Sequence, residues 1–410
     1  MENPFRYGSV VSGVQFVGRR QELAELELDM RSGQNVVLIA PRRYGKTSLV
    51  LIVVERLREQ GVLVAYYDLL GAPSKAMLAN GLATALYRDL VSLHDRAWRN
   101  VTDFFHKRAF SVKLSMGPDG YPAVDLGLGE RTRDVDTALA RLLEIPGQIA
   151  KDGHKIAVVL DEFQEAPQLD EHLPALVRSV WQMQPNVSHA FLGSQRHMMQ
   201  RIFTDVNEPM YRMAKPMVLG PIDRASFVAF IRGRFSATEQ QITDDAVDRI
   251  LTITECHPFD TQQLCHFAWN LAALDKLVAT PELVDRAVGR LLAADNARYT
   301  ELWSRLTRQQ RLVLSALMAS GGTSSIYSES YRQRYGLGAA SSVQRSIKAL
   351  LEQDLVDEPL PGEYRIPDAF LRAWLARTIA TTIYVQPSGT LASTGNLSLK
   401  IIRKADRTSK

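Results

Sequence analysis

Short runs of consecutive apolar residues are the clearest pattern in this chain of 410 residues. The first run, at 36–40, is followed at once by a turn that contains glycine and lysine and then by an apolar stretch at 48–54. This order predicts a strand buried on both faces, then a loop and a helix. Similar runs, which predict four further strands, lie at 62–68, 156–160, 190–192 and 217–219.

Helical patterns separate these predicted strands. In one of them, apolar residues recur at a spacing that places them on one helix face: Leu173, Leu176, Val177, Val180 and Trp181. Because strands alternate with helices and each strand is apolar on both faces, we expect an α/β fold. Its sheet should be parallel, with helices covering both faces.

Two stretches depart from this alternation. On either side of the turn residues at 117–120, apolar and polar residues alternate, which predicts a β-hairpin inserted at about 110–129. From 223 to 296 the pattern is helical throughout, and Thr280 followed by Pro281 predicts the start of a helix there.

A third pattern begins near Thr307. Thr307 and Gln310 predict a capping box that opens a helix, and a second helix is expected at 341–353. A two-stranded hairpin is expected next, with strands at 355–358 and 363–366. Helices followed by such a hairpin predict a winged helix. Past Arg377 the pattern decays into a polar tail.

The composition is that of an ordinary globular protein and excludes few functions. Apolar residues make up 46%, and the formal charge of +4 is too small to indicate nucleic-acid binding by itself. The two cysteines, Cys256 and Cys265, form no disulfide framework, and their separation does not suit a zinc site, so we expect packed core cysteines. No apolar run approaches the roughly 18 residues of a membrane helix, and the first residues have no apolar block, so we expect a cytoplasmic protein.

The turn after the first strand carries the clearest chemistry. Residues 40–47 have the spacing of the phosphate-binding loop, with Ala40 in place of its first glycine. In such a loop, backbone N–H groups cradle phosphate oxygens, Lys46 reaches the β- and γ-phosphates, and the Thr47 hydroxyl ligates Mg²⁺. A chance match is the alternative, but the motif lies between a buried strand and a helix. The predicted nucleotide-binding residues here are Pro41, Arg42, Arg43, Tyr44, Gly45, Lys46, Thr47 and Ser48.

Two carboxylates follow the apolar run at 156–160. Asp161 stands at the end of that strand, about 115 residues after the loop, where it would hold Mg²⁺ through water. Glu162 would point toward the γ-phosphate and polarise the attacking water. The alternative interpretation is a solvated strand end.

Together these motifs resemble the archaeal-type ATPase family, a branch of the STAND and AAA+ P-loop ATPases that also occurs in bacteria. The resemblance covers roughly residues 3–376. Besides the loop and the winged-helix pattern, it rests on matches at 3–5, 16–23, 160–164, 193–195 and 255–259. It implies a P-loop NTPase parallel sheet with helices on both faces, followed by an all-α lid and a winged-helix domain.

The resemblance assigns a role to each predicted segment. It implies an ATPase domain at 1–221, a helical lid at 222–300, a winged-helix domain at 301–378 and a tail at 379–410. ATP and Mg²⁺ are the implied cofactors, and slow ATP hydrolysis is the implied activity.

Further nucleotide contacts are implied on both sides of the loop. Residues 16–19 would line the adenine, although a hydrophobic staple before a helix is the alternative. Ser194 and Gln195 follow the fourth predicted strand, where such ATPases keep a polar residue that senses the γ-phosphate. A polar strand end is the alternative for that pair. The residues of the adenine segment are Phe16, Val17, Gly18 and Arg19.

Two more residues are implied with less support from the motif. Arg212 resembles the arginine of a Tyr-Gly-Arg segment, with its glycine absent, and would stabilise charge on the transferred phosphate in cis or in trans. A surface salt bridge is the alternative. Pro258 resembles the proline of a lid motif that closes over the nucleotide, although a buried helix start explains it as well.

The winged helix offers a route to DNA. Its candidate recognition helix carries Gln344, Arg345 and Lys348 on the polar face. Residues 301–380 hold ten Arg/Lys and eight Asp/Glu, a weaker basic surplus than phosphate-dominated binding shows. Three functions stay open: an ATP-hydrolysing switch, a DNA-binding regulator that holds ATP, and an interaction scaffold with a protein partner. Glu162 favours the first, and an oligomer is compatible with all three.

Overall fold

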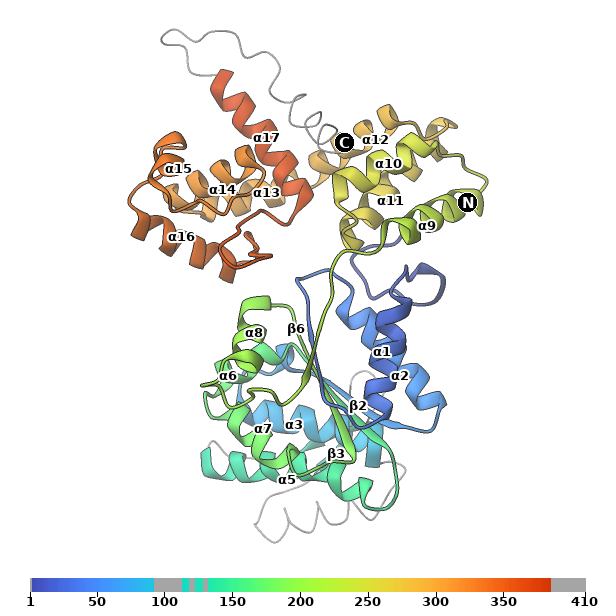
Figure 1. Ribbon diagram of the computed structural model, residues 1–410. Coiled ribbons are helices and arrows are strands. Elements are labelled where there is room, and N and C mark those ends of the chain that lie inside the picture. Colours follow the sequence, from blue (N-terminus) through green and yellow to red (C-terminus); the bar gives the residue numbers. More distant parts are fainter. Residues whose placement is uncertain (1, 92–112, 118–121, 128–131, 385–410) are drawn as a thin grey trace. The chain divides into compact units, whose positions relative to one another are not determined.

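The computed structural model describes residues 2–91, 113–117, 122–127 and 132–384. Contacts divide the chain into two compact units. One unit is Gly8–Ile222, and the other joins Met1–Tyr7 to Asp223–Lys410. The first seven residues therefore belong with the carboxy-terminal part of the chain (Figure 1).

The first unit is built around a five-stranded sheet in the order β2-β5-β6-β1-β7, and all its pairs are parallel. Every residue of β1, β5 and β6 is buried, which explains why these strands read as continuous apolar runs. All five expected strands are present, so the predicted fold class is confirmed. The strands are β1 (Val36–Ile39), β2 (Leu63–Asp68), β5 (Ile156–Asp161), β6 (Val187–Gly193) and β7 (Lys215–Val218).

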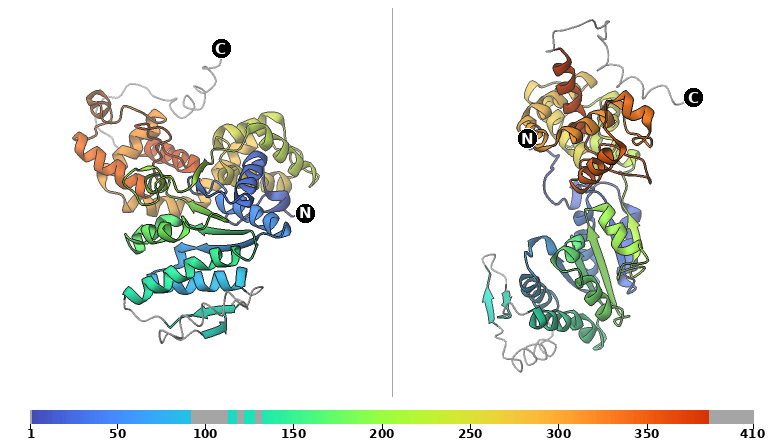
Figure 2. Two further views of the ribbon diagram at one scale, coloured as in Figure 1. Left: turned by 60° about the horizontal axis from the view of Figure 1, so that its bottom comes forward. Right: turned by 90° about the vertical axis from the view of Figure 1, so that its left-hand side faces the viewer.

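Helices cover both faces of this sheet (Figure 2). Successive strand residues point to opposite faces, so Val36 and Leu38 pack with the first helix pair while Val37 and Ile39 pack on the other side. The first pair is α1 (Arg20–Arg31) and α2 (Lys46–Glu59). The opposite face carries α3 (Lys75–Leu86), α5 (Thr132–Ala150), α7 (Leu173–Trp181) and α8 (Arg196–Thr204). Short helical segments are η1 (Gly13–Gln15), η2 (Leu69–Gly71), η3 (Tyr87–Val91), η4 (Phe163–Glu165) and α6 (Ala166–Leu169).

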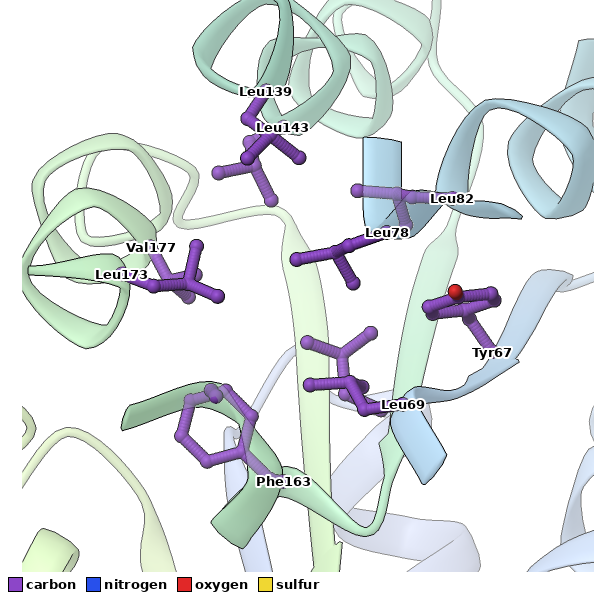
Figure 3. A pocket seen from close by; sticks show the side chains of 11 residues that line it. Tyr67, Leu69, Leu78, Leu82, Leu139, Leu143, Phe163, Leu173 and Val177 are labelled. Atoms are coloured by element: carbon purple, nitrogen blue, oxygen red, sulfur yellow. The ribbon is translucent and has the colours of Figure 1, made fainter. Parts of the chain in front are cut away.

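A small apolar cavity lies inside the core on the second face. Its volume is about 20 Å³, which is room for about one water molecule. The side chains of Leu78, Leu139 and Val177 point toward it from three different helices (Figure 3). Because its lining lacks the polar partners that a water needs, we interpret it as a dry packing defect and not as a ligand site.

The expected hairpin is present and rests on α3. Strands β3 (Lys113–Met116) and β4 (Pro122–Asp125) pair antiparallel, while most of the expected turn lies outside the described residues. The Val124 N–H donates to Thr84 Oγ1 at 2.9 Å. This bond fixes β4 to the helix that covers the sheet.

The second unit is helical, as the pattern from 223 onward predicts. The capping box of Thr307 and Gln310 is formed, and Pro281 opens its helix. The helices are α9 (Arg224–Ser236), α10 (Asp244–Thr254), α11 (Pro258–Asp275), α12 (Pro281–Ala294), α13 (Asn296–Arg305), α14 (Arg308–Ser320), α15 (Glu329–Arg334), α16 (Ala340–Glu352) and α17 (Ala369–Tyr384).

The amino-terminal motif is bound into this helical unit. The Asn3 side chain donates to the carbonyl of His266 at 3.0 Å and to Asn270 Oδ1 at 2.8 Å. Phe5 is fully buried and packs against Phe235. The motif therefore anchors the start of the chain to α11 and α9.

The wing is shorter than expected, and α17 is longer. The predicted hairpin is reduced to a bridge between Asp357 and Arg365, and Thr323 adds a second bridge with Tyr364. Helix α17 continues to Tyr384, beyond the point where the polar pattern begins.

Candidate phosphate-binding and metal site

The phosphate-loop motif connects the central strand β1 to the first turn of α2. Gly45 adopts φ 82°, a left-handed conformation that glycine reaches without steric cost, and it precedes the helix. Glycine offers no side chain to cap α2, so the first N–H groups of the helix keep their capacity to bind an anion. This arrangement fits the predicted phosphate cradle.

Lys46 begins α2 and is buried. Its exposed fraction is 6%, and its Nζ donates to the carbonyl of Ala40 at 3.2 Å. The ammonium group thus lies inside the loop that would hold the phosphates. Of the remaining loop residues, Tyr44 and Ser48 are buried, Arg42 and Arg43 are exposed, and Pro41 is half-buried.

Asp161 lies beside Thr47, although the two are 114 residues apart in the sequence. The Thr47 hydroxyl donates to Asp161 Oδ2 at 3.0 Å. The Tyr66 hydroxyl donates to the same oxygen at 2.7 Å, and the Glu162 N–H donates to Oδ1 at 2.9 Å. Burial raises the pKa of Tyr66, and the Asp161 charge raises it further, so Tyr66 keeps its proton as a donor.

The donor set of Thr47 and Asp161 fits Mg²⁺. Both are oxygen ligands, the type that Mg²⁺ prefers. Among the described residues, no group of three or more His, Cys, Asp or Glu could hold a metal. A site with one carboxylate and one hydroxyl matches Mg²⁺, which keeps several waters and takes further oxygens from substrate phosphates.

Glu162 is held by three donors. Its Oε2 accepts from the Ser194 hydroxyl at 2.8 Å, from the Ser194 N–H at 3.3 Å and from Gln164 Nε2 at 2.5 Å. The residue has φ 53°, a left-handed conformation that costs a non-glycine residue about 1 kcal/mol. The three hydrogen bonds and this backbone turn fix the direction of the carboxylate. A Cβ at Gly193 would lie 2.3 Å from Met199 Cγ and 2.6 Å from Gln164 Oε1, so a larger residue there would force both side chains to move.

Arg19 connects the loop to the end of the first unit. Its guanidinium donates to the carbonyl of Gly220 at 2.6 Å and to the carbonyl of Tyr44 at 3.3 Å, and it pairs with Glu22 at 3.0 Å. The side chain is buried. Of the other predicted adenine residues, Phe16 packs on the core formed by α1 and α2, Val17 is buried, and Gly18 has a left-handed backbone.

Residues 16–264 match the family described as "ATPase domain predominantly from Archaea", and this match covers more than half of the chain. The chain belongs to this ATPase family. Residues 297–377 of this archaeal-type ATPase also match a family described as a probable winged helix domain.

Solved structures of similar fold cover most of this ATPase. The Walker-type ATPase PABY2304 of Pyrococcus abyssi has a TM-score of 0.59 and 17% identity, covering 88% of this chain and 96% of its own. The ORC1 protein of Aeropyrum pernix, solved with DNA, has a TM-score of 0.47 and 16% identity, covering 90% and 95%. The RuvB branch migration motor of Thermotoga maritima has a TM-score of 0.42 and 11% identity, covering 91% and 97%. No curated protein matches the chain.

Arg212 is not brought to the phosphate loop of its own chain. In the parallel pair β1 and β7, Lys215 lies opposite Val36, the first residue of β1, whereas the loop follows Ile39. Arg212 precedes Lys215, so it lies at the end of the sheet where the parallel strands begin. At least the length of β1, about 10 Å, separates it from the loop. This geometry does not support a role in cis, and a role in trans stays a prediction.

Other predicted residues lie outside the hydrogen-bonded cluster. Gln195 precedes α8 and is half-buried, and its side chain does not cap that helix. Pro258 begins α11 in the second unit, where His257 accepts from the Asp260 N–H. Its contact with nucleotide therefore stays a prediction, and so does that of Gln195.

Two residues of this cluster were not among the predicted site residues. Tyr66 lies in the middle of a strand that reads as ordinary core, and its contact with Asp161 arises because β2 and β5 are neighbours. Gln164 belongs to a matching motif, but only the structure shows that its amide binds Glu162.

Two structural features bear on the remaining expectations. Cys265 is fully buried, as expected for a core cysteine, whereas Cys256 is only partly buried and does not belong to the core. Within the described residues, none of the helices combines the length and the apolar character that crossing a membrane requires.

Proposed function

We propose that this archaeal-type ATPase hydrolyses ATP in a Mg²⁺-dependent reaction. The observation that supports this most is the contact of 3.0 Å between Thr47 and Asp161, with Glu162 next to it in the sequence. A phosphate loop alone would serve a binding protein. A loop whose hydroxyl touches a buried carboxylate, with a fixed second carboxylate beside it, has the parts that hydrolysis needs.

Each side chain has a separate task in this proposal. The first N–H groups of α2 and the Lys46 ammonium bind the phosphate oxygens. Thr47 and Asp161 would hold Mg²⁺, which would supply positive charge to the bound phosphates. Glu162 orients a water toward the γ-phosphate and accepts its proton, because its Oε2 is fixed by hydrogen bonds and its Oε1 is left for the water.

We also propose that nucleotide binding acts on the second unit, as in a conformational switch. Arg19 supports this idea, since it binds the carbonyl of Tyr44 in the loop and the carbonyl of Gly220. Gly220 lies two residues before the end of the first unit at Ile222. A shift of the loop on binding ATP would therefore move the segment that leads into α9.

ATP turnover with purified full-length protein tests the proposal. The wild type should release phosphate with Mg²⁺ and fall to background in EDTA. Lys46→Ala should lose nucleotide binding and turnover, whereas Lys151→Ala, which changes an exposed lysine in the turn that follows α5, should behave as wild type. Phosphate release that persists in EDTA or in Lys46→Ala would overturn the proposal.

A second candidate function is DNA binding through α16. Gln344, Arg345 and Lys348 are all exposed and lie within about one turn of this helix, on the face opposite the buried Val343 and Ile347. An exposed polar helix face in a winged-helix domain is the surface that enters a DNA groove in proteins of this type. Phosphate contacts by Arg345 and Lys348 would make such binding sensitive to salt.

A further inference from the structure

We propose that Tyr66 is a positioning residue for the metal-binding carboxylate of this ATPase. This role rests on the Mg²⁺-dependent function proposed above, and it identifies a side chain outside every motif that the sequence offers. Tyr66 would not contact the metal. It would hold Asp161 in the orientation that binds a hydrated cation.

The hydrogen bonds of Asp161 support this role. Oδ2 accepts from the hydroxyls of Tyr66 and Thr47, at 2.7 and 3.0 Å, and Oδ1 accepts from a backbone N–H. Because Thr47 gives its only proton to Asp161, the lone pairs of its oxygen point away from the carboxylate and stay available to a cation. Two hydroxyls on one oxygen therefore fix the carboxylate and aim the threonine oxygen at the same time.

The negative charge of the buried Asp161 carboxylate favours the binding of a cation. The carboxylate is 2% exposed, and all of its hydrogen-bond donors are neutral. Within the described part of the chain, Asp161 forms no ion pair. A buried carboxylate is costly unless it is paired or binds a metal, so its charge is best matched by a bound cation. Neutral donors orient the group without supplying that charge.

The backbone of Tyr66 is itself fixed. Strand β2 lies at one edge of the sheet, and its outer side is closed by side chains instead of another strand. The Tyr66 N–H donates to Asp89 Oδ2 at 3.1 Å, and Arg58 donates to the Val64 carbonyl at 2.8 Å. Arg58 also lies 3.6 Å from Asp89. These contacts fix the backbone of β2, so the Tyr66 hydroxyl lies at a defined position.

The neighbouring tyrosine provides a matched control. Tyr67 is adjacent on β2 but points to the opposite face of the sheet, where it lines the apolar cavity. Tyr67→Phe removes the same atom from the same strand without touching Asp161. Any general effect of losing a tyrosine hydroxyl from β2 should appear in both variants.

The test is the binding of a fluorescent ATP analogue to wild type, Tyr66→Phe and Tyr67→Phe. Each protein is titrated in EDTA and then over a range of Mg²⁺ concentrations, and its melting temperature is measured in EDTA. Tyr66→Phe should need about tenfold more Mg²⁺ for half-maximal Mg²⁺-dependent binding, the effect expected when a group that orients a metal ligand is lost. Its affinity in EDTA should equal that of wild type, and Tyr67→Phe should match wild type in both.

Two results would overturn this role while leaving the proposed function intact. One is a Mg²⁺ requirement in Tyr66→Phe no higher than in Tyr67→Phe. The other is a loss of affinity in Tyr66→Phe that is equal in EDTA and in Mg²⁺, which would indicate a general structural role. If nucleotide binding by the wild type does not respond to Mg²⁺, the proposed function fails together with the role of Tyr66.

Discussion

The Ser194 hydroxyl donates a hydrogen bond of 2.8 Å to Oε2 of Glu162. A side chain expected to sense the γ-phosphate thus binds the residue proposed to activate water. The Ser194 N–H reaches the same oxygen at 3.3 Å, so serine and glutamate act as one unit here. Ser194 would therefore act on the reaction by orienting Glu162.

Ser194→Ala should lower kcat about tenfold with little change in the affinity for ATP, because the carboxylate loses one of its fixing donors while the phosphate loop is untouched. Steady-state kinetics and nucleotide binding check this. Ser188→Ala is the control, since Ser188 is a buried serine on β6, the strand that Ser194 follows, and donates to the Gln34 carbonyl. If Ser194→Ala instead weakens ATP binding and leaves ADP binding and kcat unchanged, the γ-phosphate sensor interpretation is correct.

Arg19→Ala should destabilise the protein by about 3 kcal/mol and weaken ATP binding several-fold. The change leaves the carbonyls of Tyr44 and Gly220 without their charged donor, and the bond to Tyr44 is a buried one. Urea unfolding and nucleotide titration measure the two effects. Arg20→Ala, at the exposed neighbouring position, should change neither. Wild-type stability in Arg19→Ala would contradict the idea that this side chain holds the loop.

The strands of the sheet and the phosphate loop could be predicted because their signals are local. Strand β1 is covered on both faces of the sheet, and residues such as Val37 and Leu38 are buried. The strand therefore appears in the sequence as a continuous apolar run, whichever strands lie beside it. The loop is equally local, since Gly45, Lys46 and Thr47 are consecutive. Asp161 could be placed near it because parallel strands end at the same edge.

Contacts between distant segments could not be predicted. The bond from Tyr66 to Asp161 depends on β2 lying beside β5, and neither residue signals this order. Likewise, the position of Arg212 at the end of the sheet opposite the phosphate loop depends on the pairing of β7 with β1. The wing was overestimated because the apolar pattern around Val356 shows burial but not how many residues pair.

Acidification should destabilise the protein through His189. This imidazole is fully buried, and burial lowers its pKa to about 3. It stacks on Trp181 with ring centroids 4.0 Å apart, and its Nε2 has no partner in the described structure. In the unfolded chain its pKa is about 6.5, so unfolding takes up a proton between these values and stability falls as pH drops below about 6.5.

The expected loss from this group is about 2 kcal/mol between pH 7 and pH 5. His189→Gln removes the titration, so urea unfolding of the variant should lose about 2 kcal/mol less over this range than wild type. Other groups that titrate there contribute equally to both proteins. Identical pH dependence in the two would show that His189 does not titrate as described.

If α16 binds DNA, replacing Arg345 and Lys348 together by alanine should weaken binding at least tenfold and reduce its salt dependence, because two phosphate-binding charges are lost. Fluorescence anisotropy with labelled duplex DNA at two salt concentrations checks this. Arg308→Ala, an exposed arginine at the start of α14, is the control. Failure of the wild type to bind DNA, or equal binding by all three proteins, would exclude α16 as the DNA-binding surface.

The most direct test of the account is single-turnover ATP hydrolysis by Glu162→Gln compared with wild type, with ATP binding measured on the same samples. The substitution keeps the size of the side chain but removes its ability to accept a proton. The account predicts ATP affinity within about threefold of wild type and a hydrolysis rate at least about 100-fold lower. Equal hydrolysis rates in the two proteins, at equal ATP occupancy, would contradict it.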